Sequence, residues 1–361
     1  MTVLLAPDGF KGSITAADAC AALAAGWREV DAGAQLVARP MADGGEGTLD
    51  AFAAAVPDAR RMPVVVTGPD GCDVDAAWLL LPDGTGVVEL ASTSGIELLG
   101  TARLPFDAHT CGFGQAIAAA LDHGVQRLVL GIGSSASTDG GAGMLRALGA
   151  RYEGADGLRA LPGIDRLDVT GLRMPPPGGA LVLSDVTNPL CGPAGAAAVF
   201  GPQKGLCAHD VPGADAALAH WADVVAAALP GADPTTPGAG AAGGTGFALQ
   251  AWGARLVSGS AEVAELVGLP QAVAAASLVV TGEGAYDSQS AAGKAPAHVA
   301  ALAAEAGVPV ALVAGRIAPD ADLSPFAASL SLSELADSAD AALADPVRWL
   351  REAGSALAAH F

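Results

Sequence analysis

Short apolar runs that end in glycine-rich polar loops recur along the chain, and each loop leads into a segment with helical periodicity. The first two runs span residues 3–6 and 36–39, and the helices expected after them span residues 16–30 and 49–56. The alternation of strand, loop and helix is typical of a parallel sheet, in which ligands bind at the carboxyl ends of the strands.

The pattern changes at residue 63, where strands are joined by Gly-Pro-Asp-Gly and Pro-Asp-Gly turns that predict an antiparallel meander. The meander strands are expected at 64–67, 74–81 and 86–91. The later strands are expected at 128–130, 180–184, 278–281 and 308–313, the third of them followed by a loop at 282–288. The later helices are expected at 114–123, 142–150, 215–229, 247–257, 295–306 and 335–360.

The parallel pattern occupies both ends of the chain, which predicts an α/β fold with two domains. Residues 1–62 and 275–361 are expected to form a parallel-sheet domain. Residues 63–274 are expected to form a mixed α/β domain inserted between them. A cleft between two such domains is a common place for a binding site.

The composition is that of a globular protein with a large core, because 52% of the 361 residues are hydrophobic and 16% are charged. The net charge of −20 argues against nucleic acid and anionic membranes as partners, since phosphate groups need a basic surface. No apolar run reaches the roughly 18 residues of a membrane span, and the first residues lack the basic segment of a signal peptide. The five cysteines form no C-x-x-C pair, so we expect a reducing cytoplasmic location.

Residues 128–144, LVLGIGSSASTDGGAGM, join an apolar strand to a helix through a loop with little side-chain bulk. Glycines let the backbone take positive φ and approach another molecule closely. A strand that ends in such a loop presents backbone N–H groups at a helix N-terminus, where anions bind. The alternative is a tight turn capped by Ser and Thr hydroxyls.

Charged side chains collect in the glycine-rich loops. The chain has only three lysines, which a GC-rich genome would explain, and all three lie beside glycine. Their position beside glycine could also be a coincidence. A cap or an Asx turn would explain any one of seven loop carboxylates. Together they indicate phosphoryl transfer, in which carboxylates hold Mg²⁺ while cations and backbone amides hold phosphate. These residues are Lys11, Lys204 and Lys294, with Asp8, Asp43, Glu46, Asp139, Asp185, Glu283 and Asp287.

A dinucleotide-binding loop is the competing interpretation. Residues 131–136, GIGSSA, follow a strand, and Glu153 lies about 20 residues further on, where a ribose-binding acid is expected. This pattern would suit a nicotinamide-dependent hydroxy-acid oxidoreductase. A Walker A motif is absent, because Ala295 follows Lys294 where Ser or Thr is required. A third interpretation is a non-catalytic sensor of hydroxy acids or nucleotides.

Seven motifs in order resemble the bacterial glycerate kinases of the type-1 family over nearly the whole chain. They are APDGFKGS, ADGGEGT, GIGSSASTDGGAGM, DVTNPL, FGPQKG, PGAGAAGG and TGEGAYDSQS…GK. The resemblance implies ATP and Mg²⁺, D-glycerate as the substrate, and 2-phosphoglycerate as the usual product, with glycerate 3-kinase activity as the alternative. It also implies two α/β domains, one of them flavodoxin-like. The oligomeric state stays open between a monomer and a homodimer.

Residue chemistry and motif membership together indicate the catalytic groups. Lys11 and Lys294 are expected to face the substrate carboxylate or the transferring phosphate. Asp139 or Asp43 is expected to orient the attacking hydroxyl.

Mg²⁺ and the nucleotide are assigned to other loops. Asp185, with the sole asparagine Asn188 nearby, is expected to bind Mg²⁺. The loops at 131–141 and 238–246 are expected to bind the nucleotide phosphates. The remaining candidates for substrate or phosphate binding are Asp8, Ser13, Glu46, Ser134, Ser135, Lys204, Gly243, Gly244, Thr245, Glu283 and Asp287.

Two positions depart from the pattern of the family. Cys111 stands in a segment, HTCGFG, where the family usually carries an arginine, and Ala285 stands where an arginine is common. Both changes remove a cation that could bind an anion, so they bear on substrate choice.

Overall fold

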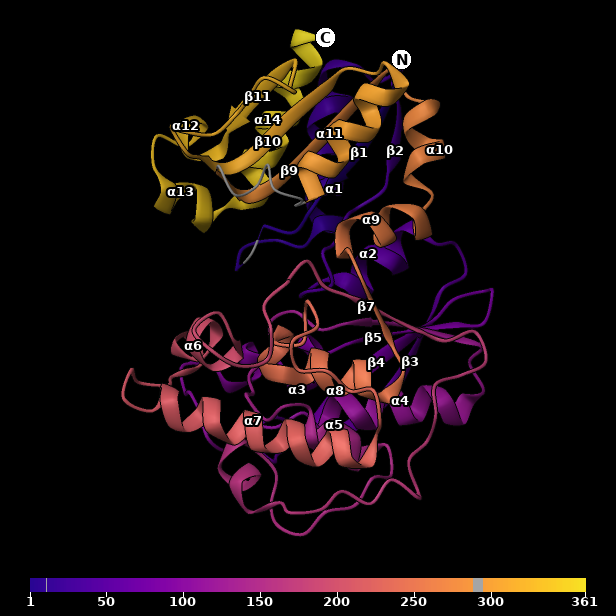
Figure 1. The fold of residues 1–361 in the computed structure, drawn as a ribbon. Helices are drawn as coiled ribbons and strands as arrows, with labels where there is room; N and C mark the ends of the chain where they lie inside the picture. The colour runs from indigo at the N-terminus through magenta and orange to yellow at the C-terminus, as the bar shows by residue number, and fades with distance from the viewer. Residues whose placement is uncertain (11, 288–294) are drawn as a thin grey trace. The chain divides into compact units, whose positions relative to one another are not determined.

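The protein consists of two compact units, each built around one β-sheet, in a computed structural model that describes residues 1–10, 12–287 and 295–361 (Figure 1). Unit 1 is formed by both ends of the chain and comprises Met1–Asp43, Asp50–Pro57 and Gly259–Phe361. Unit 2 comprises Gly44–Leu49 and Asp58–Ser258. The sheets are mostly parallel, which confirms the α/β class. The limits of the units fall near residues 57 and 258, whereas the sequence pattern places them near 62 and 274.

The sheet of unit 1 has five parallel strands in the order β11-β10-β9-β1-β2. Its strands are β1 (Thr2–Pro7), β2 (Gln35–Ala38), β9 (Leu278–Tyr286), β10 (Val310–Ile317) and β11 (Ala328–Ser331). The helices are α1 (Ala16–Val30), most of α2 (Thr48–Ala55), α9 (Gly259–Leu266), α10 (Leu269–Ala274), α11 (Ala295–Ala306), α12 (Leu332–Leu335), α13 (Ala339–Ala344) and α14 (Pro346–His360). Because the strands are parallel, their carboxyl ends share one edge.

Helices cover both faces of this sheet, with α11 and α14 on opposite sides in Figure 1. Helices α1 and α14 share a core with the face that carries Val3 and Val313. Glycines let these two helices approach closely, since a Cβ at Gly26 would lie 1.8 Å from the carbonyl oxygen of Arg351. The sheet therefore carries closely packed helices on the face that holds Val3 and Val313.

The sheet of unit 2 has six strands in the order β3-β4-β5-β6-β7-β8. The first three are antiparallel neighbours, as the meander pattern predicts, and β5 to β8 are parallel. The strands are β3 (Arg60–Thr67), β4 (Asp73–Leu80), β5 (Thr85–Glu89), β6 (Arg127–Gly131), β7 (Ala180–Leu183) and β8 (Arg255–Val257).

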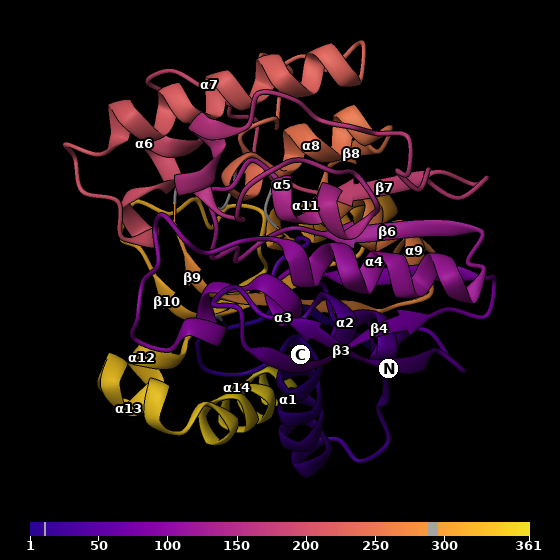
Figure 2. The ribbon, with the colours of Figure 1, turned by 90° about the horizontal axis from the view of Figure 1, so that it is seen from below.

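The helices of unit 2 form a layer on this sheet, in which Figure 2 shows α4, α5, α8 and α7 as neighbours. Its α-helices are α3 (Ala91–Ser94), α4 (Cys111–His123), α5 (Ala142–Ala147), α6 (Ala196–Phe200), α7 (Val211–Ala228) and α8 (Thr245–Trp252). Its 3₁₀ turns are η1 (Ile96–Leu99), η2 (Leu158–Gly163), η3 (Pro202–Lys204) and η4 (Ala241–Gly244).

Two segments that were each predicted as one helix are divided into several elements in the structure. The helix expected at 247–257 ends at Trp252, because Gly253 takes a left-handed conformation with φ of 102°, and the chain then continues as the edge strand β8. The helix expected at 335–360 is three helices. Ser338 and Asp345 each accept a hydrogen bond from a backbone N–H at a new helix start, and Pro346 opens the last helix.

The loop expected at 282–288 is also wrong in part, because β9 continues to Tyr286. Pairing with β10 extends through Tyr286 and Ile317, so a neighbouring strand keeps this glycine-rich stretch extended. Local glycine content predicts a loop here, but the hydrogen bonds of the sheet override that preference. The consequence is that Glu283 projects from a strand instead of a loop.

Candidate active site

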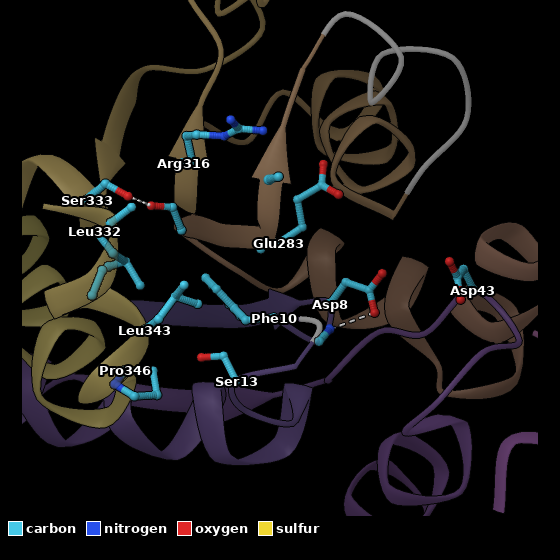
Figure 3. Close-up of a pocket in the computed structure, with 16 residues that line it drawn as sticks. Asp8, Phe10, Ser13, Asp43, Glu283, Arg316, Leu332, Ser333, Leu343 and Pro346 are labelled. Carbon is cyan, nitrogen blue, oxygen red and sulfur yellow. Dashed lines mark hydrogen bonds between the residues drawn. The ribbon is translucent and has the colours of Figure 1, made fainter. Parts of the chain in front are cut away.

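A cavity of about 430 Å³ lies at the carboxyl ends of β1, β9 and β10 in unit 1 (Figure 3). Four of the residues that the sequence nominates line it together: Asp8, Ser13, Asp43 and Glu283. They come from separate loops and strands, so the parallel order of the sheet brings them to one place. Three carboxylates at a cavity wall can accept hydrogen bonds from substrate hydroxyls or hold a divalent cation.

The backbone holds Asp8 at the edge of this cavity. Its N–H donates to the carbonyl oxygen of Gly282 at 2.8 Å, which links the end of β1 to β9. The carboxylate Oδ1 of Asp8 accepts the N–H of Gly9 at 2.7 Å, the bond drawn in Figure 3. Gly282 also permits the close approach of β9 to β10, since a Cβ there would lie 2.0 Å from the carbonyl oxygen of Val313.

Asp43 is positioned by contacts on both sides. The N–H of Met41 donates to the carbonyl oxygen of Pro7 at 2.8 Å, which places this segment beside the end of β1. Gly259 packs on the other side, where a Cβ would lie 2.1 Å from the carbonyl oxygen of Asp43. The carboxylate is therefore carried by a backbone that is held closely at both points.

Other predicted site residues lie elsewhere or outside the described part. Lys11 and Lys294 lie outside the described residues. Glu46 is exposed and belongs to unit 2. Asp287 follows β9, and it is not among the described residues that line the cavity.

Asp139 in unit 2 is completely buried, and both of its carboxylate oxygens are bound by donors of the protein. Oδ2 accepts the N–H and hydroxyl of Thr110 at 2.9 and 2.8 Å and the N–H of Gly143 at 3.2 Å. Oδ1 accepts the Ser137 hydroxyl at 3.2 Å and the Gly141 N–H at 3.1 Å. This geometry orders the glycine-rich loop after β6, and every oxygen already has protein partners.

Lys204 contacts both glycine-rich loops of unit 2, at 131–141 and 238–246. Its Nζ donates to the hydroxyl of Ser135 at 2.7 Å and to the carbonyl oxygen of Ser137 at 2.5 Å, and the side chain is buried. The second loop touches the same point, because a Cβ at Gly243 would lie 2.9 Å from Nζ. The N–H of Gly140 also donates to the carbonyl oxygen of Gly243 at 3.0 Å.

The neighbouring candidates have local roles in the same two loops. Ser134 takes a positive φ of 58°, and its carbonyl oxygen accepts the N–H of Ile96 at 2.8 Å. Gly244 has a φ of 94°, and the hydroxyl of Thr245 donates to the carbonyl oxygen of Ala242 at 2.8 Å. These contacts shape the backbone on which any phosphate site in unit 2 would depend.

Burial lowers the pKa of the Lys204 ammonium to about 7, and the nearby charge of Asp139 opposes this only in part. The unfolded chain then binds more protons than the folded chain between pH 7 and 10.5, so stability rises with pH in that range. From pH 7 to pH 9, we expect the free energy of unfolding of the wild type to rise by about 2 kcal/mol more than that of Lys204→Met. Denaturant titrations of both proteins at the two pH values measure this gain, and parallel pH profiles would contradict it.

Asp185 and Asn188 lie on the segment that follows β7. Oδ1 of Asp185 accepts the Ser258 hydroxyl at 2.8 Å, and Nδ2 of Asn188 donates to the carbonyl oxygen of Ala194 at 2.8 Å. The carboxylate of Asp185 is exposed. In Asn188 the amide nitrogen is used in the bond to Ala194, and the amide oxygen is the atom that can bind a metal ion. These oxygen donors fit the ligand preference of Mg²⁺, which keeps several waters and binds protein through one or two carboxylates.

A profile of the glycerate kinase family matches residues 3–361. The chain belongs to the glycerate kinase family. It is 43% identical over 332 residues to the glycerate kinase of Bacillus subtilis (strain 168), covering 89% of this chain and 87% of that protein. It is 41% identical over 330 residues to the glycerate 2-kinase of Escherichia coli (strain K12), covering 89% of this chain and 86% of that protein.

A solved structure supports the same assignment. A crystal structure described as glycerate kinase 2 from Salmonella typhimurium LT2 matches with a TM-score of 0.85 at 37% identity, covering 100% of this chain and 98% of that one. The family resemblance of the seven motifs is therefore confirmed. The chain is a phosphotransferase with glycerate kinase activity, which decides the function class against the oxidoreductase and sensor interpretations.

Sequence reasoning missed Arg316, which lines the cavity beside Gly315 on β10. A signal was available, because Gly-Arg follows the buried run Val310–Ala314 in the same way that other loop charges follow strands.

Proposed function

We propose that the protein catalyses the ATP- and Mg²⁺-dependent phosphorylation of D-glycerate to 2-phosphoglycerate. The observation that carries this proposal is the cavity of unit 1, where Asp8, Asp43 and Glu283 meet at the ends of parallel strands. These carboxylates lie on one side of a cavity of about 430 Å³, where they can accept hydrogen bonds from the hydroxyls of a small polyhydroxy acid. The likeness to a relative named glycerate 2-kinase, at 41% identity, supports transfer to the 2-hydroxyl.

In the proposed reaction, a glycerate hydroxyl oxygen attacks the γ-phosphorus, and the bond from that phosphorus to the leaving oxygen of ADP breaks. Asp43 orients the hydroxyl and accepts its proton, while Asp8 and Glu283 accept hydrogen bonds from the substrate. We assign Asp139 to ordering its loop, because its oxygens are already bound by protein donors. Lys11 and Lys294 are proposed to neutralise the transferring phosphate.

Within unit 2 we propose that the loops at 131–141 and 238–246 bind nucleotide phosphates through backbone N–H groups. Lys204 supports this by fixing the two loops against each other through Ser135 and Ser137. Its ammonium already has protein partners, so its proposed contribution is positioning.

The test is a coupled assay with ATP, Mg²⁺ and D-glycerate. Enolase and pyruvate kinase report 2-phosphoglycerate directly, whereas 3-phosphoglycerate is detected only after phosphoglycerate mutase is added. Signal without the mutase supports the proposal, and a signal that requires it favours the 3-kinase alternative.

Mg²⁺ is proposed to bind Asp185 and Asn188, where it would supply charge neutralisation for the nucleotide phosphates. We expect Asp185→Asn to raise the Mg²⁺ concentration for half-maximal activity by about tenfold or more, because a neutral amide is a weaker ligand than a carboxylate. Asp223→Asn, which removes an exposed carboxylate of α7, is the matched control. Superimposable Mg²⁺ titrations of Asp185→Asn and wild type would remove Asp185 from the metal site.

We propose a cytoplasmic location, with glycerate and ATP as the small-molecule partners and with a homodimer as one of the two open oligomeric states. All five cysteines are free thiols in the structure, which suits a reducing compartment. Among the described helices, none has both the length and the apolar character needed to cross a bilayer.

A further inference from the structure

The cavity of unit 1 has an uneven distribution of charge. Among the described residues that line it, three carry carboxylates and one, Arg316, carries a cation. Glycerate is itself an anion, and like charges repel strongly where solvent is partly excluded. The substrate carboxylate therefore needs a place within the cavity that lies against a positive group.

The strand register places Arg316 on the same face of the sheet as Glu283. Ala314 is paired with Glu283 and Arg316 with Ala285 across β10 and β9. Side chains two residues apart on a strand share a face, so Glu283, Ala285 and Arg316 all project to one side. Only a methyl group stands opposite Arg316, which leaves room for its guanidinium and for a ligand. Figure 3 shows Arg316 and Glu283 on neighbouring strands at the cavity wall.

The backbone around Arg316 is held in place. A Cβ at Gly315 would lie 2.4 Å from the carbonyl oxygen of Gly284, so glycine here lets the two strand ends pack closely. The hydroxyl of Ser333, another residue of the cavity, donates to the carbonyl oxygen of Gly315 at 2.7 Å. The start of the Arg316 side chain is therefore fixed relative to the cavity.

The guanidinium of Arg316 makes no hydrogen bond or ion pair with any described residue. Arginines elsewhere are used structurally, as in the pairs Arg159–Asp107 and Arg173–Asp122, at 2.7 and 2.8 Å. A guanidinium presents N–H groups in a planar fork that matches a carboxylate with two parallel hydrogen bonds. Arg316 is exposed and has no partner among the described residues, so its guanidinium is available to bind an anion at the cavity wall.

We propose that Arg316 binds the carboxylate of the substrate and so sets the direction in which glycerate lies. This inference rests on the proposed function. With the carboxylate at Arg316, the hydroxyls point toward the acidic end of the cavity, where Asp8 and Glu283 accept their hydrogen bonds. Arg316 is then the residue that selects hydroxy acids over neutral polyols.

The test compares wild type, Arg316→Gln and Arg316→Lys with D-glycerate and with neutral D-glyceramide, which has the same shape without the charge. We expect Arg316→Gln to raise KM for D-glycerate at least 100-fold and to leave kcat/KM for D-glyceramide within about threefold of wild type. Arg316→Lys should recover part of the loss, because it keeps the charge but not the fork. Calorimetric titration of D-glycerate into each protein measures the same loss without turnover.

Arg28→Gln is the matched control, since Arg28 is an exposed arginine of α1 in the same unit and does not line the cavity. An unchanged KM and affinity for D-glycerate in Arg316→Gln would overturn the inference. Equal losses for D-glycerate and D-glyceramide, or a rise in KM for ATP alone, would also overturn it. Absence of kinase turnover in the wild type would instead refute the proposed function, and the calorimetric comparison would still decide the role of Arg316.

Discussion

Replacing Asp43 with asparagine is expected to lower kcat with D-glycerate about 1000-fold, which corresponds to about 4 kcal/mol of transition-state stabilisation. An amide keeps the size of the side chain but accepts no proton, so the attacking hydroxyl loses its base. KM for D-glycerate is expected to change much less, because the substrate keeps its other contacts in the cavity. Steady-state kinetics with the coupled assay measure both constants.

Asp320→Asn is the matched control for this prediction. Asp320 is an exposed acid that follows β10 in the same unit, and it does not line the cavity. Its replacement removes the same charge and should leave kcat unchanged. If Asp43→Asn retained kcat within about threefold of the wild type, the proton-accepting role would pass from Asp43 to another acid of the cavity.

The second large effect is expected from Gly243→Ala, which should lower the free energy of unfolding by about 3–4 kcal/mol. Gly243 has a φ of 66°, which an L side chain adopts at a cost. The new Cβ would also lie 2.1 Å from the carbonyl oxygen of Ser137. This oxygen accepts a hydrogen bond from the ammonium group of Lys204. The substitution therefore separates the two loops that Lys204 joins. Denaturant unfolding measures the loss.

Gly192→Ala separates the two contributions. Gly192 has a φ of 90°, in the same left-handed region, but a Cβ there would meet no atom within 4 Å. It should therefore lose only about 1 kcal/mol, the cost of the backbone conformation alone. Equal losses in the two variants would show that the contact with Ser137 contributes nothing.

Local sequence determined the elements whose signals are complete within a few residues. The first helix begins and ends where the sequence predicts, at Ala16–Val30, because Thr15 accepts the N–H of Asp18 as the capping box requires. The antiparallel meander also follows from its turns. The prediction for β9 failed because a distant segment decides its length, since pairing with β10 extends it to Tyr286.

The seven motifs were sufficient to recognise the family, because short sequence motifs and their order along the chain can be identified without a structure. They also nominated four residues that share one cavity, Asp8, Ser13, Asp43 and Glu283. The sequence did not distinguish these from Asp139, whose motif is just as rich in glycine. That carboxylate is turned inward onto Thr110 and Gly143, and only the packed loop shows it.

The sequence by itself determined which residue types follow the strands, because hydrophobic runs and the glycines after them can be identified directly in the sequence. Tertiary structure alone decided which of those strand ends meet, because β1 pairs with β9, a strand far away in the sequence. That pairing brings Asp8 beside Gly282, and the next pairing, between β9 and β10, brings Arg316 opposite Ala285. The physical reason is that hydrogen bonds between parallel strands set the neighbours of a side chain, and a single strand carries no record of its partner's register.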